Sequence, residues 1–318
     1  MIEFDCVTKI FPSGKKALSE ISFSVEKGET LALLGRSGCG KTSALRLINR
    51  LIEPTSGAIY FDAKKLSTID PITLRRGIGY AIQHIGLFPH MTVEENVSIV
   101  PNLLKWTEKK IEQRAHELLE IVGLDPKVFS SRLPSQLSGG QKQRVGVARA
   151  LAADPPVILM DEPFGALDPI MREQLQNEFL AIQAKIQKTV LFVTHDLSEA
   201  VKIGDRIAVM EKGEIVQIAT PKELLEKPAN EFVDAFIGKD RLLLMMQIET
   251  LKPLKNHLMS DQKIEKGPKI DLHSSLLESL LTFKQKKAKN LSVFDGDKYI
   301  GELPQDVLFE KLVTLIES

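Results

Sequence analysis

Residues 35–42 read Gly35-Arg36-Ser37-Gly38-Cys39-Gly40-Lys41-Thr42 and fit the pattern G-x-x-x-x-G-K-[ST] of a phosphate-binding loop. The segment before it, Thr30 to Leu34, has the pattern of a buried strand, and Ser43 to Leu51 has apolar residues at helical spacing. A loop between a strand and a helix start points several backbone N–H groups inward, and the helix dipole adds positive charge there. We therefore expect a polyphosphate at this loop, with Lys41 reaching the outer phosphates and the Thr42 hydroxyl binding Mg²⁺.

The composition is that of a packed globular protein. The chain has 318 residues, 43% of them apolar, and its 42 basic and 42 acidic side chains cancel. This length suits one large α/β domain with a smaller appendage, and a net charge of zero gives no reason to expect nucleic acid as a partner. Two cysteines suit a reducing cytoplasm, and the N-terminal segment MIEFDCVTKIF lacks the apolar core of a signal peptide.

Short apolar runs alternate with helical segments, and this alternation predicts the fold class. The pattern predicts an α/β fold with a mostly parallel sheet covered on both faces, whose ligands bind at the carboxyl ends of the strands. Short strands before residue 28 add an antiparallel part. An amphipathic stretch from Ile111 to Val122 predicts a helical insertion, which we place at about 92–155.

A shift in composition near Gly238 predicts a domain boundary. We expect a first domain at 1–238, a linker at 239–268, and a small C-terminal module at 269–318. The module has the pattern of a strand, a helix, two strands and a second helix, and is therefore predicted to be α+β.

Two carboxylates follow the apolar run from Val157 to Met160. Asp161 is predicted to hold Mg²⁺, through water, and Glu162 to polarise an attacking water as general base. His195 follows a second apolar run in the same way. The phosphate loop, the two carboxylates and His195 are all predicted at strand ends, so we expect them to meet at one edge of the sheet.

A second anion site is predicted at Leu137-Ser138-Gly139-Gly140-Gln141, where a serine and two glycines open a helix. Because the phosphate loop already serves one nucleotide, a second such site suggests nucleotide binding across a dimer. Together these motifs resemble the ATPase subunits of ABC transporters, whose signature motif is LSGGQ. The resemblance covers about residues 1–238.

The resemblance implies a homodimer that encloses two ATP molecules head to tail, each between the phosphate loop of one chain and the signature motif of the other. It also implies that Phe11 stacks on adenine, that Gln83 binds Mg²⁺ and senses the γ-phosphate, and that Asp168 lies in the segment Ala166-Leu167-Asp168 at the dimer seam. His195 would contact the γ-phosphate. The residues expected to contact ATP are Phe11, Gly35, Arg36, Ser37, Gly38, Cys39, Gly40, Lys41, Thr42, Ser43 and Asp168, with Ser138, Gly139, Gly140 and Gln141 contacting the ATP of the partner chain. The expected Mg²⁺ ligands are Thr42, Gln83 and Asp161, and the expected catalytic residues are Lys41, Gln83, Glu162 and His195.

The apolar segment Gly86-Leu87-Phe88-Pro89 falls in a predicted loop. In the family this region forms a groove for a short cytoplasmic helix of the membrane permease, so contacts are expected at Phe88, Pro89, His90 and Met91. The alternative is a loop that packs on itself. A separate substrate-binding protein would complete the system, and the chain would lie at the cytoplasmic face of the inner membrane as a peripheral subunit.

Within the family, the segments INRLIEPTSG, IGYAIQHIGLFPHMTVEENV and FIGKDR resemble importers of glycine betaine, choline or carnitine. Those systems typically carry paired CBS modules, and residues 269–318 resemble one such module. Gly301 is followed by Pro304 and Asp306, which departs from the usual nucleotide-binding pattern. A degenerate regulatory or dimerising module is therefore predicted.

Two other functions remain as alternatives. One is an importer ATPase for a different substrate, such as an amino acid. The other is an ABC ATPase that acts on nucleic acid or ribosomes, but the neutral charge and the short interval between Lys41 and Leu137 disfavour it. A scaffold that binds ATP without turnover leaves Glu162 unexplained.

Overall fold

The structure is a computed structural model that describes residues 1–81, 86–165, 168–259 and 267–317. The chain divides into two compact units, Met1–Ile218 and Ala219–Ser318.

A six-stranded sheet forms the centre of the first unit, with the strand order β10-β9-β3-β8-β7-β6. Five neighbouring strands of this sheet are parallel to one another: β9, β3, β8, β7 and β6. Every residue of β3, β7 and β8 is buried, as expected for parallel strands covered on both faces. The bounds are β3 (Thr30–Gly35), β6 (Ile78–Ala81), β7 (Val157–Asp161), β8 (Thr189–Thr194), β9 (Arg206–Glu211) and β10 (Glu214–Ala219).

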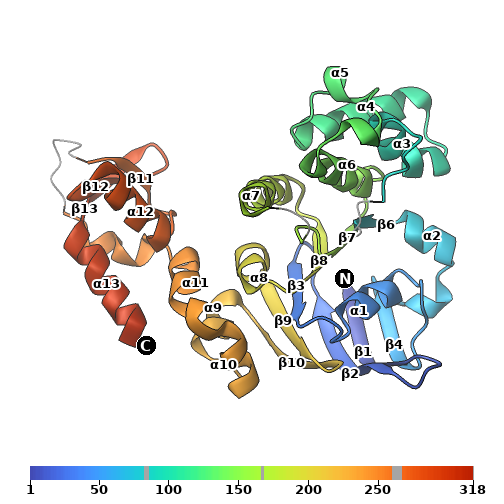
Figure 1. The fold of residues 1–318 in the computed structure, drawn as a ribbon, viewed down its shortest axis with the longest axis horizontal. Helices are drawn as coiled ribbons and strands as arrows, with labels where there is room; N and C mark the ends of the chain where they lie inside the picture. The colour runs from blue at the N-terminus through green and yellow to red at the C-terminus, as the bar shows by residue number, and fades with distance from the viewer. Residues whose placement is uncertain (82–85, 166–167, 260–266, 318) are drawn as a thin grey trace. The chain divides into compact units, whose positions relative to one another are not determined.

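A second, antiparallel sheet has the order β2-β1-β4-β5. Phe4 of β1 stacks on Phe23 of β2 with ring centroids 4.4 Å apart. One apolar core joins this sheet to a face of the parallel sheet and to α1, while α7 and α8 lie over the opposite face (Figure 1). The bounds are β1 (Ile2–Ile10), β2 (Lys16–Val25), β4 (Ser56–Phe61), β5 (Lys64–Lys65), α1 (Lys41–Ile48), α2 (Pro71–Arg76), α7 (Pro169–Ile186) and α8 (Leu197–Ile203), with a 3-10 turn, η1, at Leu66–Thr68.

The helical insertion predicted at about 92–155 corresponds to a group of helices at one end of the parallel sheet, where its last helix packs against β6 (Figure 1). Its members are α3 (Val93–Leu103), α4 (Glu108–Ile121), α5 (Pro126–Phe129), the 3-10 turn η2 (Pro134–Gln136) and α6 (Gly139–Leu151). A capping box starts α3, because the Thr92 hydroxyl accepts from Glu95 N–H and the Glu95 carboxylate accepts from Thr92 N–H.

The second unit holds a three-stranded sheet of order β11-β12-β13, in which β11 and β12 are parallel and β13 is antiparallel to β12. The order of strand, helix, two strands and helix agrees with the sequence pattern. The bounds are α9 (Pro221–Glu226), α10 (Glu231–Ile237), η3 (Gly238–Asp240), α11 (Arg241–Ile248), η4 (Lys252–His257), β11 (Lys269–Asp271), α12 (Leu276–Lys286), β12 (Asn290–Asp295), β13 (Lys298–Pro304) and α13 (Gln305–Glu317).

The division of the chain differs from the predicted domains. It lies between Ile218 and Ala219 rather than near Gly238. The predicted linker at 239–268 is, where described, largely helical, and it contributes Met246 and Leu251 to the core of the second unit. The run LLLMM looked like a change of composition, but it contains the buried face of α11. Nowhere in the described ranges is there a helix long and apolar enough to span a membrane.

Candidate nucleotide-binding site

The phosphate loop connects the end of β3 to the start of α1, as the sequence predicted. Gly40 has φ 114°, a conformation that favours glycine, and a Cβ there would lie 2.5 Å from the Ala17 carbonyl oxygen. A Cβ at Gly35 would lie 2.4 Å from the Met210 carbonyl oxygen on β9. These glycines therefore let the loop pack tightly against its neighbours.

Lys41 is buried inside this loop, with 5% of its surface exposed. Its Nζ donates to the carbonyl oxygens of Gly35 at 2.6 Å and Arg36 at 3.2 Å. Charged phosphate oxygens are stronger acceptors for an ammonium group than neutral carbonyls are. The ammonium is thus held where a phosphate group in the loop could take over these hydrogen bonds.

A pocket opens over the loop and gathers residues from distant parts of the sequence. Phe11 reaches it from the turn after β1, which is closed by a hydrogen bond of 2.9 Å from Phe11 N–H to the Lys15 carbonyl. Glu162 reaches it from the end of β7. The lining residues are Phe11, Lys15, Ala17, Ser37, Gly38, Gly40, Lys41, Thr42, Ser43 and Glu162. An aromatic ring, a phosphate cradle and a carboxylate therefore share one pocket.

Thr42 and Asp161 meet beside this pocket. The Thr42 hydroxyl donates to Asp161 Oδ1 at 3.1 Å, and Asp161, the last residue of β7, is 8% exposed. Burial raises the pKa of Asp161, and the Thr42 hydrogen bond partly offsets this. A buried carboxylate beside a hydroxyl offers the oxygen ligands that Mg²⁺ prefers, so these two residues fit the predicted metal position. The third predicted ligand, Gln83, lies outside the described residues.

Glu162 sits at a strained backbone position, with φ 46°. Its N–H donates to the Val193 carbonyl at 3.0 Å, which fixes the turn after β7 against β8. His195 Nδ1 lies 3.3 Å from Glu162 Oε2. A left-handed conformation at a residue other than glycine costs energy, and such strain concentrates at functional sites. The 3.3 Å separation shows that Glu162 and His195 meet at one edge of the sheet, as the sequence predicted.

The base of the His195 turn includes residues that sequence reasoning missed. Thr194 Oγ1 donates to Glu199 Oε2 at 2.6 Å, and burial raises the pKa of Glu199. Arg172 of α7 lies 3.3 Å from Asp196 Oδ2 and 3.7 Å from Glu199 Oε1. This network holds the turn that carries His195. The signal for this network in the sequence is Glu199, an acidic residue four positions after His195.

The signature motif forms the first turn of α6. Ser138 Oγ accepts from Gln141 N–H at 3.2 Å, and Gln141 Oε1 accepts from Ser138 N–H at 2.9 Å. A Cβ built at Gly139 would meet nothing within 4 Å. Of the described residues 138–141, none lines the pocket over the phosphate loop. Within one chain, these signature residues therefore take no part in the pocket over the phosphate loop.

Asp168 is the N-cap of α7, where its Oδ1 accepts from the N–H groups of Ile170 and Met171, each at 3.1 Å. The adjoining Ile170 is 80% exposed. Ala166 and Leu167, which precede Asp168 in the predicted seam segment, lie outside the described residues.

Known proteins match both the sequence and the fold. Residues 18–165 match the family model described as ABC transporter. The chain is 49% identical over 296 residues to the glycine betaine/carnitine/choline transport ATP-binding protein of Bacillus subtilis, covering 93% of this chain and 76% of that protein. The chain belongs to the ABC transporter ATP-binding proteins. ATP hydrolysis coupled to transport is therefore its activity.

Other members of the ABC family support this placement. The chain is 56% identical over 247 residues to the osmoprotectant import ATP-binding protein of Salmonella typhimurium, covering 76% of this chain and 65% of that one. The dimeric structure of a bacterial ABC transporter cassette superposes with a TM-score of 0.62 at 36% identity, covering 70% of this chain and 99% of that one. A second structure is a dimeric ATP-binding cassette in a post-hydrolysis state bound to ADP and Pi; its TM-score is also 0.62, at 35% identity, with the same coverage.

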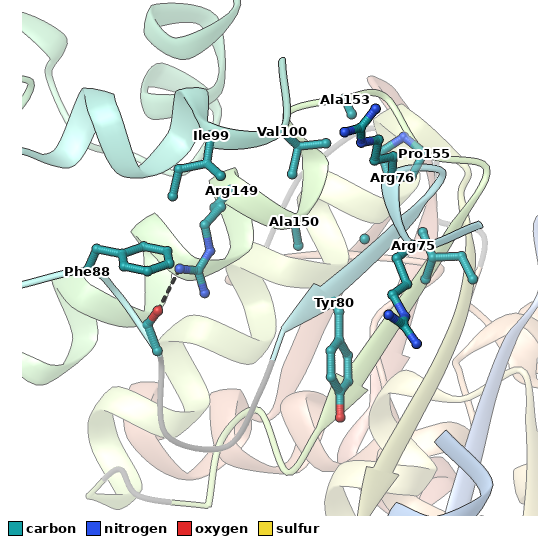
Figure 2. Close-up of a pocket in the computed structure, with 13 residues that line it drawn as sticks. Arg75, Arg76, Tyr80, Phe88, Ile99, Val100, Arg149, Ala150, Ala153 and Pro155 are labelled. Carbon is teal, nitrogen blue, oxygen red and sulfur yellow. Dashed lines mark hydrogen bonds between the residues drawn. The ribbon is translucent and has the colours of Figure 1, made fainter. Parts of the chain in front are cut away.

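A groove in this ABC protein lies between α2, β6, α3 and α6 (Figure 2). Phe88 lines it on one side, and Arg149 of α6 donates to the Gly86 carbonyl at 2.7 Å. The buried Asn96 side chain fixes the loop, accepting from Phe88 N–H at 2.8 Å and donating to the Met91 carbonyl at 3.0 Å. Of the predicted permease contacts, all four of which the structure describes, Phe88 alone lines the groove. Pro89 and His90 are exposed beside it.

Proposed function

We propose that this chain is the ATP-hydrolysing subunit of an importer for an osmoprotectant such as glycine betaine, choline or carnitine. The supporting observation is that three importer subunits named for these compounds are 46% to 50% identical to the chain over most of its length, and one named for osmoprotectant import is 56% identical. Import of another substrate, such as an amino acid, is the alternative, and uptake of labelled substrates distinguishes the two.

The nucleotide pocket supports the predicted roles in ATP binding. Phe11 stacks on the adenine, and the loop N–H groups with Lys41 hold the phosphates. Thr42 and Asp161 hold Mg²⁺, directly or through water, and the ion neutralises phosphate charge when it is bound. The hydrogen bond between these two side chains already sets them side by side.

Glu162 is the proposed general base. Its carboxylate lines the pocket that holds the phosphates, so it can accept a proton from a water that attacks the γ-phosphate. His195, 3.3 Å away, orients that carboxylate and donates toward the γ-phosphate. Lys41 stabilises the charge that develops on the phosphate oxygens.

The signature motif supports a head-to-tail dimer. The first turn of α6 has N–H groups at its start, and there is free space around Gly139. Neither feature belongs to the nucleotide pocket of the same chain. A helix N-terminus of this kind binds anions. In the proposed dimer, the start of α6 completes the nucleotide site of the partner chain, and Asp168 lies at the interface between the two chains.

The C-terminal module is proposed to be regulatory or dimerising rather than a nucleotide site. A Cβ at Gly301 would lie 2.9 Å from Leu258 Cβ and 3.0 Å from the Met259 carbonyl oxygen. Internal packing thus accounts for this glycine without a ligand. The resemblance to a single degenerate CBS module remains part of the proposal.

Uptake of labelled substrate tests the proposed cargo. Cells that lack their own osmoprotectant importers would express this chain with its neighbouring permease and substrate-binding genes. We expect uptake of glycine betaine, choline or carnitine, and none with Glu162→Gln in place of the natural chain. Uptake of an amino acid, with none of these three compounds, would contradict the substrate assignment.

The groove of Figure 2 is the proposed docking site of the permease, in contact with the cytoplasmic face of the membrane subunit. Phe88 is 44% exposed at its edge, so Phe88→Asp should lower uptake by about tenfold or more, as loss of an aromatic anchor does. ATP hydrolysis by the isolated subunit should persist, since Phe88 does not line the nucleotide pocket. Val128→Asp, at a residue that is 45% exposed on α5, is the matched control. Unchanged uptake with Phe88→Asp would place the permease elsewhere.

A further inference from the structure

A partly buried ion pair joins the signature helix α6 to α7. Arg144 Nη2 lies 2.6 Å from Glu178 Oε1, and 15% of the Arg144 side chain and 31% of the Glu178 side chain are exposed. Gln174, one turn earlier in α7, donates from Nε2 to the same Glu178 oxygen at 3.0 Å. Arg144 Nη1 also donates to the Gly123 carbonyl just after α4, at a longer 3.5 Å. The guanidinium therefore connects α6 to two other parts of the unit.

A side-chain contact at the start of α6 adds to this connection. Gly140 is buried, and a Cβ there would lie 2.6 Å from Met171 Cε, so the Met171 side chain of α7 packs over the first turn of α6. The N–H of the same Met171 donates to Asp168. The signature motif (138–141) and Asp168, the two features proposed to face a partner chain, are therefore adjacent within one chain.

The contact beneath the ion pair is mostly apolar. A small pocket there is bounded by Val147 of α6, Met160 of β7 and Phe179 of α7. Phe179 meets Phe164 with ring centroids 6.4 Å apart, and Phe164 follows Glu162 by two residues. Apolar contacts are non-directional, whereas a charge-assisted hydrogen bond between Arg and Glu has a defined geometry, so it can hold two helices in one register.

We propose that Arg144 and Glu178 are positioning residues that lock α6 to α7, so that the signature motif and Asp168 enter the partner's nucleotide site as one rigid unit. The inference rests on the proposed dimer. Neither residue lines the nucleotide pocket of its own chain. Their loss is therefore expected to impair dimer formation while ATP binding at the phosphate loop persists.

The test uses the Glu162→Gln chain, which is expected to form a stable dimer with ATP. Arg144→Glu and Glu178→Arg are each introduced into it, and then both together, which restores an ion pair with the charges exchanged.

Sedimentation equilibrium with ATP measures the dimer, and titration with a fluorescent ATP analogue at low protein concentration measures binding to one chain. Each single variant should weaken the dimer by about tenfold or more, and the exchanged pair should recover most of that loss. The affinity of one chain for the analogue should stay within about twofold.

Arg132→Glu is the matched control, because the Arg132 guanidinium donates to the Val128 carbonyl at 3.1 Å and lies over the Phe129 ring, both of which belong to α5. It should leave the dimer unchanged. Arg144→Lys and Glu178→Gln are milder variants for use if a charge reversal prevents folding, and each should still weaken the dimer. The inference would be overturned if the single variants dimerised as tightly as the parent, or if the exchanged pair dimerised no better than the single variants. Either result would leave the proposed dimer itself intact. A Glu162→Gln parent that stays monomeric with ATP would overturn the proposed dimer and this inference with it.

Discussion

Replacing Glu162 with glutamine is expected to abolish steady-state ATP hydrolysis while ATP binding persists. Glutamine keeps the shape of the side chain and can still accept a hydrogen bond from His195, but it cannot take a proton from water. Loss of a general base lowers the rate by about a hundredfold or more. Phosphate release measures the turnover, and equilibrium binding of an ATP analogue measures the retained affinity.

Glu112→Gln is the control for this prediction, because Glu112 is an exposed glutamate of α4. It should hydrolyse ATP at the natural rate. Normal turnover by the Glu162→Gln chain would refute the assignment of the base. Loss of ATP binding along with turnover would show instead that Glu162 supports the structure of the pocket.

Lys41→Ala is expected to weaken ATP binding strongly. The ammonium group lies buried inside the loop, and its hydrogen bonds to phosphate oxygens would be charge-assisted. Hydrogen bonds to charged groups contribute about 1.5–3 kcal/mol, which corresponds to about a tenfold to a hundredfold loss of affinity. Titration with a fluorescent ATP analogue measures this loss.

Lys64→Ala, at an exposed lysine of β5, controls for the loss of a positive charge and should bind ATP normally. Thermal unfolding without nucleotide checks that the Lys41→Ala chain is folded. A folded variant that binds ATP as tightly as the natural chain would show that the phosphates do not lie where Lys41 can reach them.

The motif-bearing parts of the fold could be predicted because each is local in sequence. The phosphate loop needs only a strand, its glycines and a helix in succession, and the carboxylates of Asp161 and Glu162 follow directly from the end of β7. The structure confirms the mixed sheets and brings Glu162 to 3.3 Å from His195. The specific roles of these residues in binding and catalysis stay predictions.

Contacts between distant helices could not be predicted in the same way. Arg144 and Arg172 lie on helices whose charged residues look like ordinary solvated positions in the sequence. Their partners, Glu178 for the first and Asp196 for the second, are determined by how α6, α7 and α8 pack. Helical periodicity shows which residues share a face of one helix, but it does not show which face of another helix lies opposite.

The difference between the predicted boundary near Gly238 and the division between Ile218 and Ala219 has a related reason. The sequence predicts a linker at α11 because the apolar run beside Gly238 has no motif and adjoins a proline and a polar stretch. Burial of Met246 and Leu251 depends on strands and helices that come later in the chain. Two expected features, Gln83 and the pair Ala166-Leu167, fall outside the described residues.

The central claim is that two chains enclose two ATP molecules, each held by the phosphate loop of one chain and the signature motif of the other. The mass and nucleotide content of the Glu162→Gln protein in ATP test it most directly. Analytical ultracentrifugation, with the bound nucleotide counted after isolation of the complex, should give a dimer that contains two ATP molecules and dissociates when ATP is removed. A protein that binds ATP yet remains a monomer, or a dimer that forms equally well without ATP, would contradict the claim.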